Sequence, residues 1–250
     1  MNEDMTFRRG RVRGLSRHAV CAMCLLAMGA GCMTTPYRAG AVIDDEATMA
    51  ALRASMAGQY PDQFRVVQRA VLTVRKRQFN LDGYVRIDRS EGFRFLATSG
   101  FGMTMFELAG RADGTVEVLH NSGVLEDSVL IDGPARDVLA LYLRRPSPSA
   151  QLTAPTPETW ALVDTYPGKR VEEYRFDRST GRLSMYIKAK RRRVHYTVEY
   201  GGVDEGSVSG YPERIRLSNA KMRYEVDIRV IELTPEEFDP KILTESSAHD

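Results

Sequence analysis

Cysteine and histidine are scarce in this chain of 250 residues, and their scarcity excludes several kinds of site. All three cysteines lie within the first 32 residues, so nothing after Cys32 can form a disulfide framework. The four histidines are far apart in the sequence, which gives no support to a metal site of usual ligand spacing. No nucleophile elbow and no phosphate-binding loop occurs. We therefore expect no metal, no cofactor and no enzyme, unless distant residues assemble an active site in the folded chain.

An excess of one charge is also missing once the N-terminal segment is set apart. The whole chain has 35 lysines and arginines against 33 aspartates and glutamates, and five of the arginines precede residue 18. Residues 32–250 hold 30 bases and 31 acids, so overall charge does not favour nucleic acid as a partner. Beyond residue 31, no apolar run is long enough to span a membrane as a helix.

The N-terminal segment has the pattern of a secretory signal. Residues 1–17 are rich in arginine, and residues 19–30 form a short apolar run. The run ends in Gly29-Ala-Gly-Cys32, which resembles the lipobox of bacterial lipoproteins, although that family prefers leucine where Gly29 stands. The resemblance implies a signal peptide over residues 1–31 and a lipid on the Cys32 thiol, which would anchor the protein to a membrane. The alternative is that Cys32 is a buried cysteine of the signal peptide.

Most of the remaining chain alternates apolar and polar residues, as strands with one buried face do. Such alternation covers residues 64–74, 81–87, 93–97, 116–118, 174–176, 183–187, 194–200, 215–217 and 222–230. Turn-forming residues separate the runs. The pattern predicts a mainly β fold of about ten strands, an open and strongly curved antiparallel half-barrel. A few helices would cover or plug its concave apolar face, and two are too few to fill it, which leaves room for a hydrophobic cavity.

Two segments favour helix. Residues 44–58 begin with Asp44 or Asp45 as N-cap and end at Gly58. A second helix is predicted to open at Asp132-Gly133-Pro134, with proline in the first helical position, and to end before Pro146. The proline- and serine-rich residues 146–157 are expected to cross the surface or plug an opening. We expect residues 32–43 to form a tether and residues 44–250 to form a single domain.

Two stretches resemble the outer-membrane lipoprotein receptor LolB and related LolA/LolB-like lipoproteins. The first covers residues 93–108 and 113–118, and the second covers residues 173–184, 198–204 and 211–217. The resemblance implies an open antiparallel barrel whose cavity accepts acyl chains of lipoproteins or other lipids from a soluble periplasmic LolA-like carrier. It also implies a lipid-anchored protein on the periplasmic side of the outer membrane.

The resemblance further places a membrane-insertion loop at Gly100-Phe101-Gly102. Phe101 stands where the family carries an exposed leucine, and Gly100 replaces the usual proline. A large aromatic residue between two glycines at a hairpin tip has no regular element through which to enter the core. The alternative is that Phe101 folds back onto the sheet.

Two further sets of residues are candidates for function. The expected cavity lining is Phe93, Phe95, Met103, Met105, Met185, Tyr196 and Tyr224, although ordinary core packing would use the same residues. The densest basic cluster is Lys188, Lys190, Arg191, Arg192 and Arg193, at an expected hairpin tip. The cluster suits anionic lipid headgroups or an acidic face of a carrier, and the alternative is a solvated turn.

The sequence thus favours a lipoprotein that binds acyl chains and takes part in lipoprotein or lipid transfer to the outer membrane. The alternative is a structural or assembly lipoprotein that uses the same sheet as a protein-docking platform, without lipid cargo.

Overall fold

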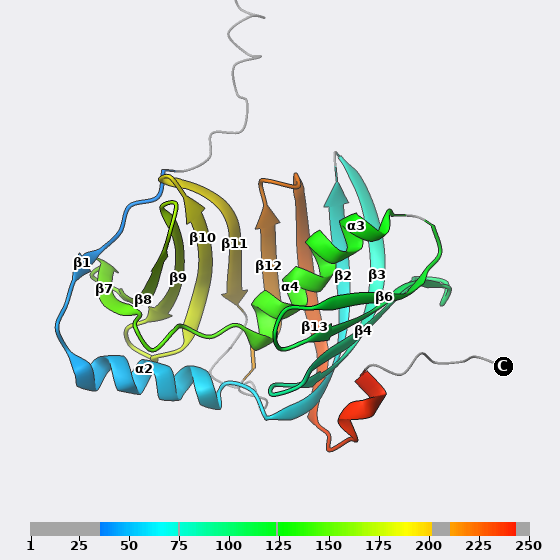
Figure 1. Cartoon of the computed structure of the whole chain (residues 1–250), viewed down its shortest axis with the longest axis horizontal. Coiled ribbons are helices and arrows are strands. Elements are labelled where there is room, and N and C mark those ends of the chain that lie inside the picture. Colours follow the sequence, from blue (N-terminus) through cyan, green and yellow to red (C-terminus); the bar gives the residue numbers. More distant parts are fainter. Residues whose placement is uncertain (1–35, 75, 124, 202–210, 244–250) are drawn as a thin grey trace, which may run out of the picture. The chain divides into compact units, whose positions relative to one another are not determined.

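The computed structural model describes residues 36–74, 76–123, 125–201 and 211–243, all within the compact unit Thr35–Asp250 (Figure 1). The predicted signal peptide and Cys32 lie outside the described residues.

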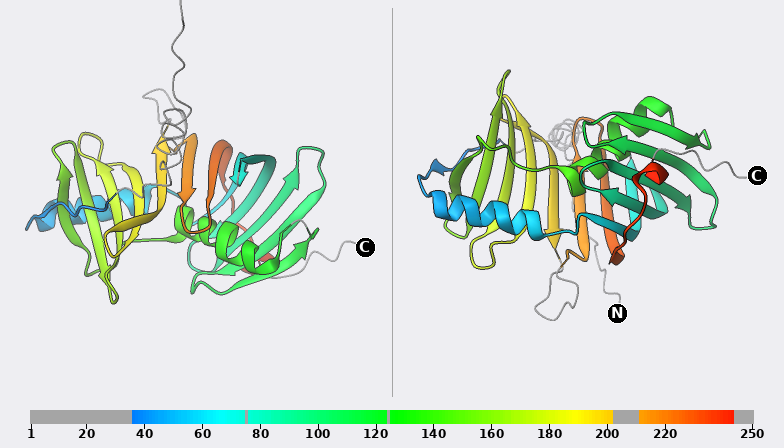
Figure 2. Two further views of the ribbon diagram at one scale, coloured as in Figure 1. Left: turned by 90° about the horizontal axis from the view of Figure 1, so that it is seen from above. Right: turned by 60° about the horizontal axis from the view of Figure 1, so that its bottom comes forward.

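One antiparallel sheet of 13 strands dominates this unit, in the order β1-β7-β8-β9-β10-β11-β12-β13-β2-β3-β4-β5-β6. The strands are β1 (Ala41–Val42), β2 (Gln63–Val74), β3 (Arg77–Asp88), β4 (Gly92–Ser99), β5 (Thr104–Arg111), β6 (Val116–Asn121), β7 (Gln151–Thr156), β8 (Thr159–Tyr166), β9 (Arg170–Asp177), β10 (Leu183–Lys190), β11 (Arg193–Gly201), β12 (Arg214–Asn219) and β13 (Tyr224–Pro235). The long pairing of β13 with β2 joins the two halves of the chain. The sheet is open, with β1 and β6 at its ends, and it curves around a helical segment (Figure 2). The predicted open, curved antiparallel fold is confirmed.

The first predicted helix is confirmed as α2 (Glu46–Gly58). Asp45 is its N-cap, and one carboxylate oxygen accepts a hydrogen bond from the Thr48 amide at 2.9 Å. The other oxygen accepts from the Thr48 hydroxyl at 2.6 Å. Leu52 and Met56 are buried, so α2 packs one face into the core.

The second predicted helix begins earlier than expected. It is a continuous helical segment of α3 (Asp127–Leu130), η1 (Ile131–Ala135), α4 (Arg136–Val138) and η2 (Leu139–Leu143), in which η1 and η2 are π-helical. Pro134 lies inside η1, so its predicted place at the helix start is wrong. Proline lacks an amide hydrogen and its ring crowds the preceding turn, and the wider π-helical turn interrupts the α-helical bonding at that point. A short 3-10 helix, η3 (Pro240–Leu243), follows β13.

The proline- and serine-rich connector is also different from its prediction. Its second half is β7, which pairs with both β1 and β8, so it extends the sheet instead of crossing its surface. The pairing of β7 with β8 shifts register between Thr153 and Thr156, next to Pro155. Proline is tolerated in strands at such irregularities, because no ladder hydrogen bond is required there.

The core lies between the concave face of the sheet and the helical segment. Its largest fully buried side chains are Tyr142, Tyr174, Tyr186, Phe64, Phe93, Phe176, Ile87, Leu108, Leu130, Leu162, Ile215 and Leu217. They come from both halves of the sheet and from α3 and η2, so one continuous core supports the whole unit.

Candidate functional site

The helical segment lies across the concave face, and its buried side chains join the core where a wide cavity was predicted (Figure 1). Phe93 is fully buried, and Phe95, Tyr196 and Tyr224 are 8%, 5% and 8% exposed within the hydrophobic core. These four predicted lining residues are therefore core residues, packed beneath side chains of α3, α4 and η2. The sequence could not reveal this, because it does not show which side chains the helix places over which strands.

Two of those residues hold the helix to the sheet through a buried carboxylate. Asp137 of α4 accepts hydrogen bonds from the hydroxyl of Tyr196 at 3.0 Å and from that of Tyr224 at 2.7 Å. Asn219 of β12 donates to the Tyr224 hydroxyl at 3.3 Å. Burial raises the pKa of Asp137 to about 7, and the two tyrosines and Lys188 limit the rise. The centre of the concave face is thus fixed by polar contacts rather than left open.

The three predicted lining methionines lie in three different environments. Met105 is partly buried against the core and lines a hollow described below. Met103 is 65% exposed in the β4–β5 turn. Met185 pairs in register with Arg175 and Glu199 after a register shift near Leu183. Because one inserted residue moves the following side chains to the opposite face, Met185 does not belong to the concave lining.

An apolar hollow of about 520 Å³ remains at one end of the concave face. It lies where β2, β3, β5 and β6 extend past the start of α3. Its lining is Leu72, Val74, Arg77, Phe79, Leu81, Met105, Phe106, Asn121 and Leu125. Asn121 donates hydrogen bonds to the Leu125 carbonyl and to Asp127, both at 2.7 Å, so its amide group is occupied. The hollow therefore offers a surface that is mainly hydrocarbon.

Of the residues that line this hollow, the sequence predicts Met105 alone as cavity lining. Leu72, Val74 and Leu81 belong to the predicted strands, and the same alternation reaches Val74 at the end of β2 and continues back from Leu81 to Phe79 near the start of β3. Apolar residues that continue to the very end of a strand are therefore the sequence signal that could indicate this lining.

The β4–β5 turn carries the predicted membrane-insertion loop at the edge of this hollow. Phe101 is 95% exposed, so it does not fold back onto the sheet. Leu81, which lines the hollow, pairs with Ser99, and Met105 is the second residue of the next strand, β5. Phe101 therefore stands at the tip of a turn whose two strands adjoin the hollow. The glycines at 100 and 102 meet no atom within 4 Å of an added Cβ, so the turn stands free of its surroundings.

The predicted basic cluster is divided by the structure. Lys190, Arg191, Arg192 and Arg193 are exposed at the β10–β11 turn. Lys188 lies apart from them, half-buried, with its ammonium nitrogen 5.1 Å from the centre of the Tyr196 ring. Burial lowers the pKa of Lys188, and Glu172 and Asp137 oppose this effect. Lys188 thus belongs to the packed concave side.

A polar hollow of about 1020 Å³ lies on the outer face of the sheet, across β12, β13, β2 and β3. Ion pairs cross it from strand to strand, between Arg214 and Asp227 and between Arg69 and Asp82. A surface with this density of charge is unsuited to hydrocarbon and suits a polar partner.

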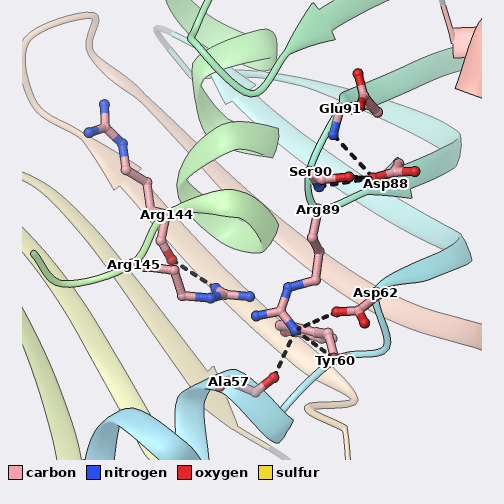
Figure 3. A network of polar contacts seen from close by, with 9 residues as sticks. All are labelled: Ala57, Tyr60, Asp62, Asp88, Arg89, Ser90, Glu91, Arg144 and Arg145. Atoms are coloured by element: carbon pink, nitrogen blue, oxygen red, sulfur yellow. Dashed lines mark hydrogen bonds and ion pairs between the residues drawn. The ribbon is translucent and has the colours of Figure 1, made fainter.

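A second polar cluster fixes the end of α2 to the β3–β4 turn (Figure 3). Arg89 donates hydrogen bonds to the carbonyl of Ala57, in the last turn of α2, at 2.7 Å and to the carbonyl of Tyr60 at 2.8 Å. The side chains of Arg89 and Arg145 point toward one another (Figure 3), and burial together with Arg89 lowers the pKa of Arg145 to about 10. Asp88 accepts from the Ser90 and Glu91 amides and shapes the turn. The cluster explains how α2 is held.

The described residues contain neither a cluster of metal-binding side chains nor a membrane-spanning helix. No group of three or more histidine, cysteine, aspartate or glutamate side chains is placed to hold a metal ion there. No helix among those same residues is long and apolar enough to cross a membrane.

Solved structures share this fold at low sequence identity. A LolA superfamily protein from Nitrosomonas europaea aligns with a TM-score of 0.54 and 13% identity, over 79% of this chain and 97% of that one. A DUF1329 family protein from Desulfovibrio piger aligns with a TM-score of 0.52 and 7% identity, over 80% and 97%. A Vibrio parahaemolyticus domain described as an outer membrane lipoprotein-sorting protein aligns with a TM-score of 0.50 and 8% identity, over 79% and 94%.

No protein-family model and no curated protein matches the sequence. At these identities the likeness concerns the fold alone. This chain has the open, curved antiparallel sheet of LolA superfamily and lipoprotein-sorting structures.

Proposed function

We propose that this protein is a lipid-anchored lipoprotein of the outer membrane that holds an acyl chain in the apolar hollow and takes part in lipoprotein or lipid transfer. The observation that carries the proposal is the hydrocarbon-lined hollow next to an exposed phenylalanine. The volume of about 520 Å³ falls in the usual range of ligand pockets. The proposed activity is binding and transfer, without making or breaking a covalent bond.

The binding energies expected for the apolar hollow and for Phe101 suit transfer of a lipid. Burying about eight methylenes in the hollow would contribute about 6 kcal/mol, which gives reversible binding. Inserting the Phe101 side chain into lipid would gain about 1.5 to 3 kcal/mol, enough for contact with a bilayer and too little for an anchor. Arg77 stands among the lining residues and provides a cation for an anionic headgroup. A soluble LolA-like carrier is the partner that this function implies.

The description of the Vibrio parahaemolyticus neighbour as an outer membrane lipoprotein-sorting protein supports this class of function. The identity of the chain as a LolB-like receptor, as opposed to another member of the fold, is part of the proposal. It depends on whether the bound cargo is a lipoprotein.

Filling the hollow should weaken acyl binding. Leu72→Trp places a large ring among the lining residues, and we expect cis-parinaric acid to bind at least about tenfold more weakly, as a loss of about 1.4 kcal/mol would produce. Fluorescence titration of the purified protein measures the change. Tyr84→Trp is the matched control, because Tyr84 is 44% exposed and lies outside the hollow lining.

A second variant separates binding from delivery. Phe101→Glu leaves the hollow intact, so probe affinity should stay unchanged while release of bound probe into vesicles slows.

Two results would contradict these predictions. Equal probe affinity in wild type and Leu72→Trp would refute the hollow as the acyl site. Equal release by Phe101→Glu would instead remove the loop from the mechanism.

The anchor is tested at Cys32. Mass spectrometry of the protein made in its own host should find an N-terminal cysteine carrying acyl groups, and Cys32→Ser should give an unacylated precursor. An unacylated wild-type N-terminus would contradict the anchor, and acyl binding in the hollow would then stand by itself.

The charged outer hollow favours a second candidate function, a protein-docking platform on a structural or assembly lipoprotein. This function predicts that purified protein carries no lipid and that Leu72→Trp changes nothing, whereas charge reversal at Arg214 and Arg216 disrupts assembly. The titration above therefore distinguishes the two.

A further inference from the structure

Several hairpin turns far apart in the sequence lie along one edge of the sheet. The registers pair Arg170 with Lys190, Lys190 with Arg193, and Tyr224 with Val74. The turns β8–β9, β10–β11, β12–β13 and β2–β3 therefore follow one another along a single edge, which points upward at β10–β11, β12–β13 and β2–β3 in Figure 1. From β9 to β3 this edge measures about 29 Å along the sheet, since neighbouring strands lie about 4.8 Å apart.

This edge, here called the basic edge, is occupied by positive side chains. Its exposed members are Lys76, Arg77, Lys169, Arg170, Lys190, Arg191, Arg192, Arg193, Lys221 and Arg223. These four turns contain no aspartate or glutamate. None of the ten side chains forms an ion pair with an acid in the described part of the chain. Turns at the opposite edge mix acids such as Glu91, Asp113 and Glu158 with arginines.

The backbone of the basic edge indicates that charge there outweighs turn preference. Five described residues other than glycine have positive φ, namely Lys76, Lys169, Arg191, Arg192 and Arg223. All five are basic and all lie on this edge. A left-handed backbone favours glycine, asparagine or aspartate, and long side chains are disfavoured there. At Arg191 and Arg192, with φ of 51° and 65°, a two-residue hairpin loop would ordinarily carry Asn-Gly.

The N-terminal tether joins the folded unit at the same edge. Pro36 forms a β-bridge with Arg193, and the Tyr37 amide donates to the Arg192 carbonyl at 2.9 Å. Cys32 and Pro36 are four positions apart in the sequence, so their Cα atoms can be at most about 14 Å apart. A lipid on Cys32 would therefore hold the basic edge next to a bilayer.

We propose that the basic edge is a membrane-docking surface that binds the headgroups of anionic phospholipids and turns this edge of the sheet toward the bilayer. An edge of ten unpaired cations about 29 Å long is complementary to a negatively charged lipid surface. The anchor belongs to the proposed function, whereas the charge of the edge is independent of it, so the two can fail separately. The β4–β5 turn with Phe101 continues the same edge of the sheet.

Vesicle binding by residues 35–250, which lack the anchor and contain the whole core, tests the proposal. We expect binding to vesicles with about 30 mol% phosphatidylglycerol, little binding to pure phosphatidylcholine, and release as salt rises from about 0.05 to about 0.5 M. Co-sedimentation measures the partitioning. Each lysine or arginine near an anionic surface is expected to strengthen partitioning onto the vesicles about fivefold.

The informative variant replaces the five positive-φ residues by ones that suit the backbone. Lys76→Asn, Lys169→Asn, Arg191→Asn, Arg192→Gly and Arg223→Asn together remove five charges, and we expect partitioning to fall by about 3000-fold, about fivefold for each charge. The melting temperature should stay the same or rise, because asparagine and glycine favour these turns. Loss of binding therefore cannot be attributed to loss of the fold.

The matched control neutralises three exposed arginines away from the basic edge, Arg111, Arg182 and Arg229, and should change partitioning by less than about threefold. Binding that ignores phosphatidylglycerol content, or that falls equally in the control, would overturn the proposal. Absence of vesicle binding by the wild type would also overturn it, and would make an acidic protein surface the partner of the edge.

Discussion

The stability of the wild-type protein relative to Asp137→Asn is expected to fall as pH rises from about 4 to about 7, and to level off above that range. The folded-state pKa of Asp137 is raised to about 7 from an ordinary value of 3.8, because the carboxyl is buried among Tyr196, Tyr224 and the core. The folded state therefore binds more protons than the unfolded state in this window, so deprotonation favours unfolding. The loss is about 3 to 4 kcal/mol in unfolding free energy.

Urea denaturation of both proteins across the pH range measures this difference. Asparagine keeps an acceptor and a donor for the two tyrosine hydroxyls and cannot ionise, so Asp137→Asn should lack this component. Asp132→Asn is the control, since Asp132 is on the same helical segment but its side chain is 52% exposed. Parallel pH profiles for wild type and Asp137→Asn would show that Asp137 has no raised pKa.

Tyr142→Ala is expected to lower the unfolding free energy by about 3 to 5 kcal/mol. Tyr142 of η2 is 1% exposed, and its ring packs edge-on against Tyr60 and Phe64 with centroids 5.6 and 6.0 Å away. Its hydroxyl donates to the Gln68 side-chain oxygen at 3.1 Å, and Gln68 is 4% exposed. The substitution leaves a cavity and an unsatisfied amide oxygen at the centre of the concave face.

Tyr142→Phe separates these two contributions, because it keeps the ring and removes only the hydroxyl. We expect it to lose about 1 to 3 kcal/mol, the cost of leaving the buried amide of Gln68 without its donor. Chemical denaturation measures both variants. A loss below about 1 kcal/mol for Tyr142→Ala would mean that η2 is loosely packed, and the interior would then be available to a ligand after all.

The sequence predicts best the strands that have one buried and one solvent-exposed face, because their side chains alternate along the chain. In β2, β3 and β12 each second residue faces the core, so alternation alone identifies them. In β8, residues 161–164 are buried on both faces, so alternation disappears and the strand was missed. The sequence predicts too late a start for the helix over residues 127–143, because Pro134 resembles a first-turn proline.

The candidate site was predicted in part. The exposed Phe101 and four of the five clustered bases lie at turns as expected, because turn position depends on nearby residues. The cavity lining could not be predicted in the same way, because it depends on which strand side chains the helical segment covers. It also depends on the register shift that places Met185 on the outer face of the sheet. Only Met105 of the predicted lining reached the hollow that remains.

The sequence by itself determined the mainly β class and the phenylalanine at a glycine-flanked tip, because each depends on residues adjacent in the chain. Only the tertiary structure decided that the concave face is packed, that the open space lies past the start of α3, and that bases from four distant turns share one edge. These features follow from strand order and register, which are set by pairing between residues far apart in the chain, such as Tyr224 with Val74.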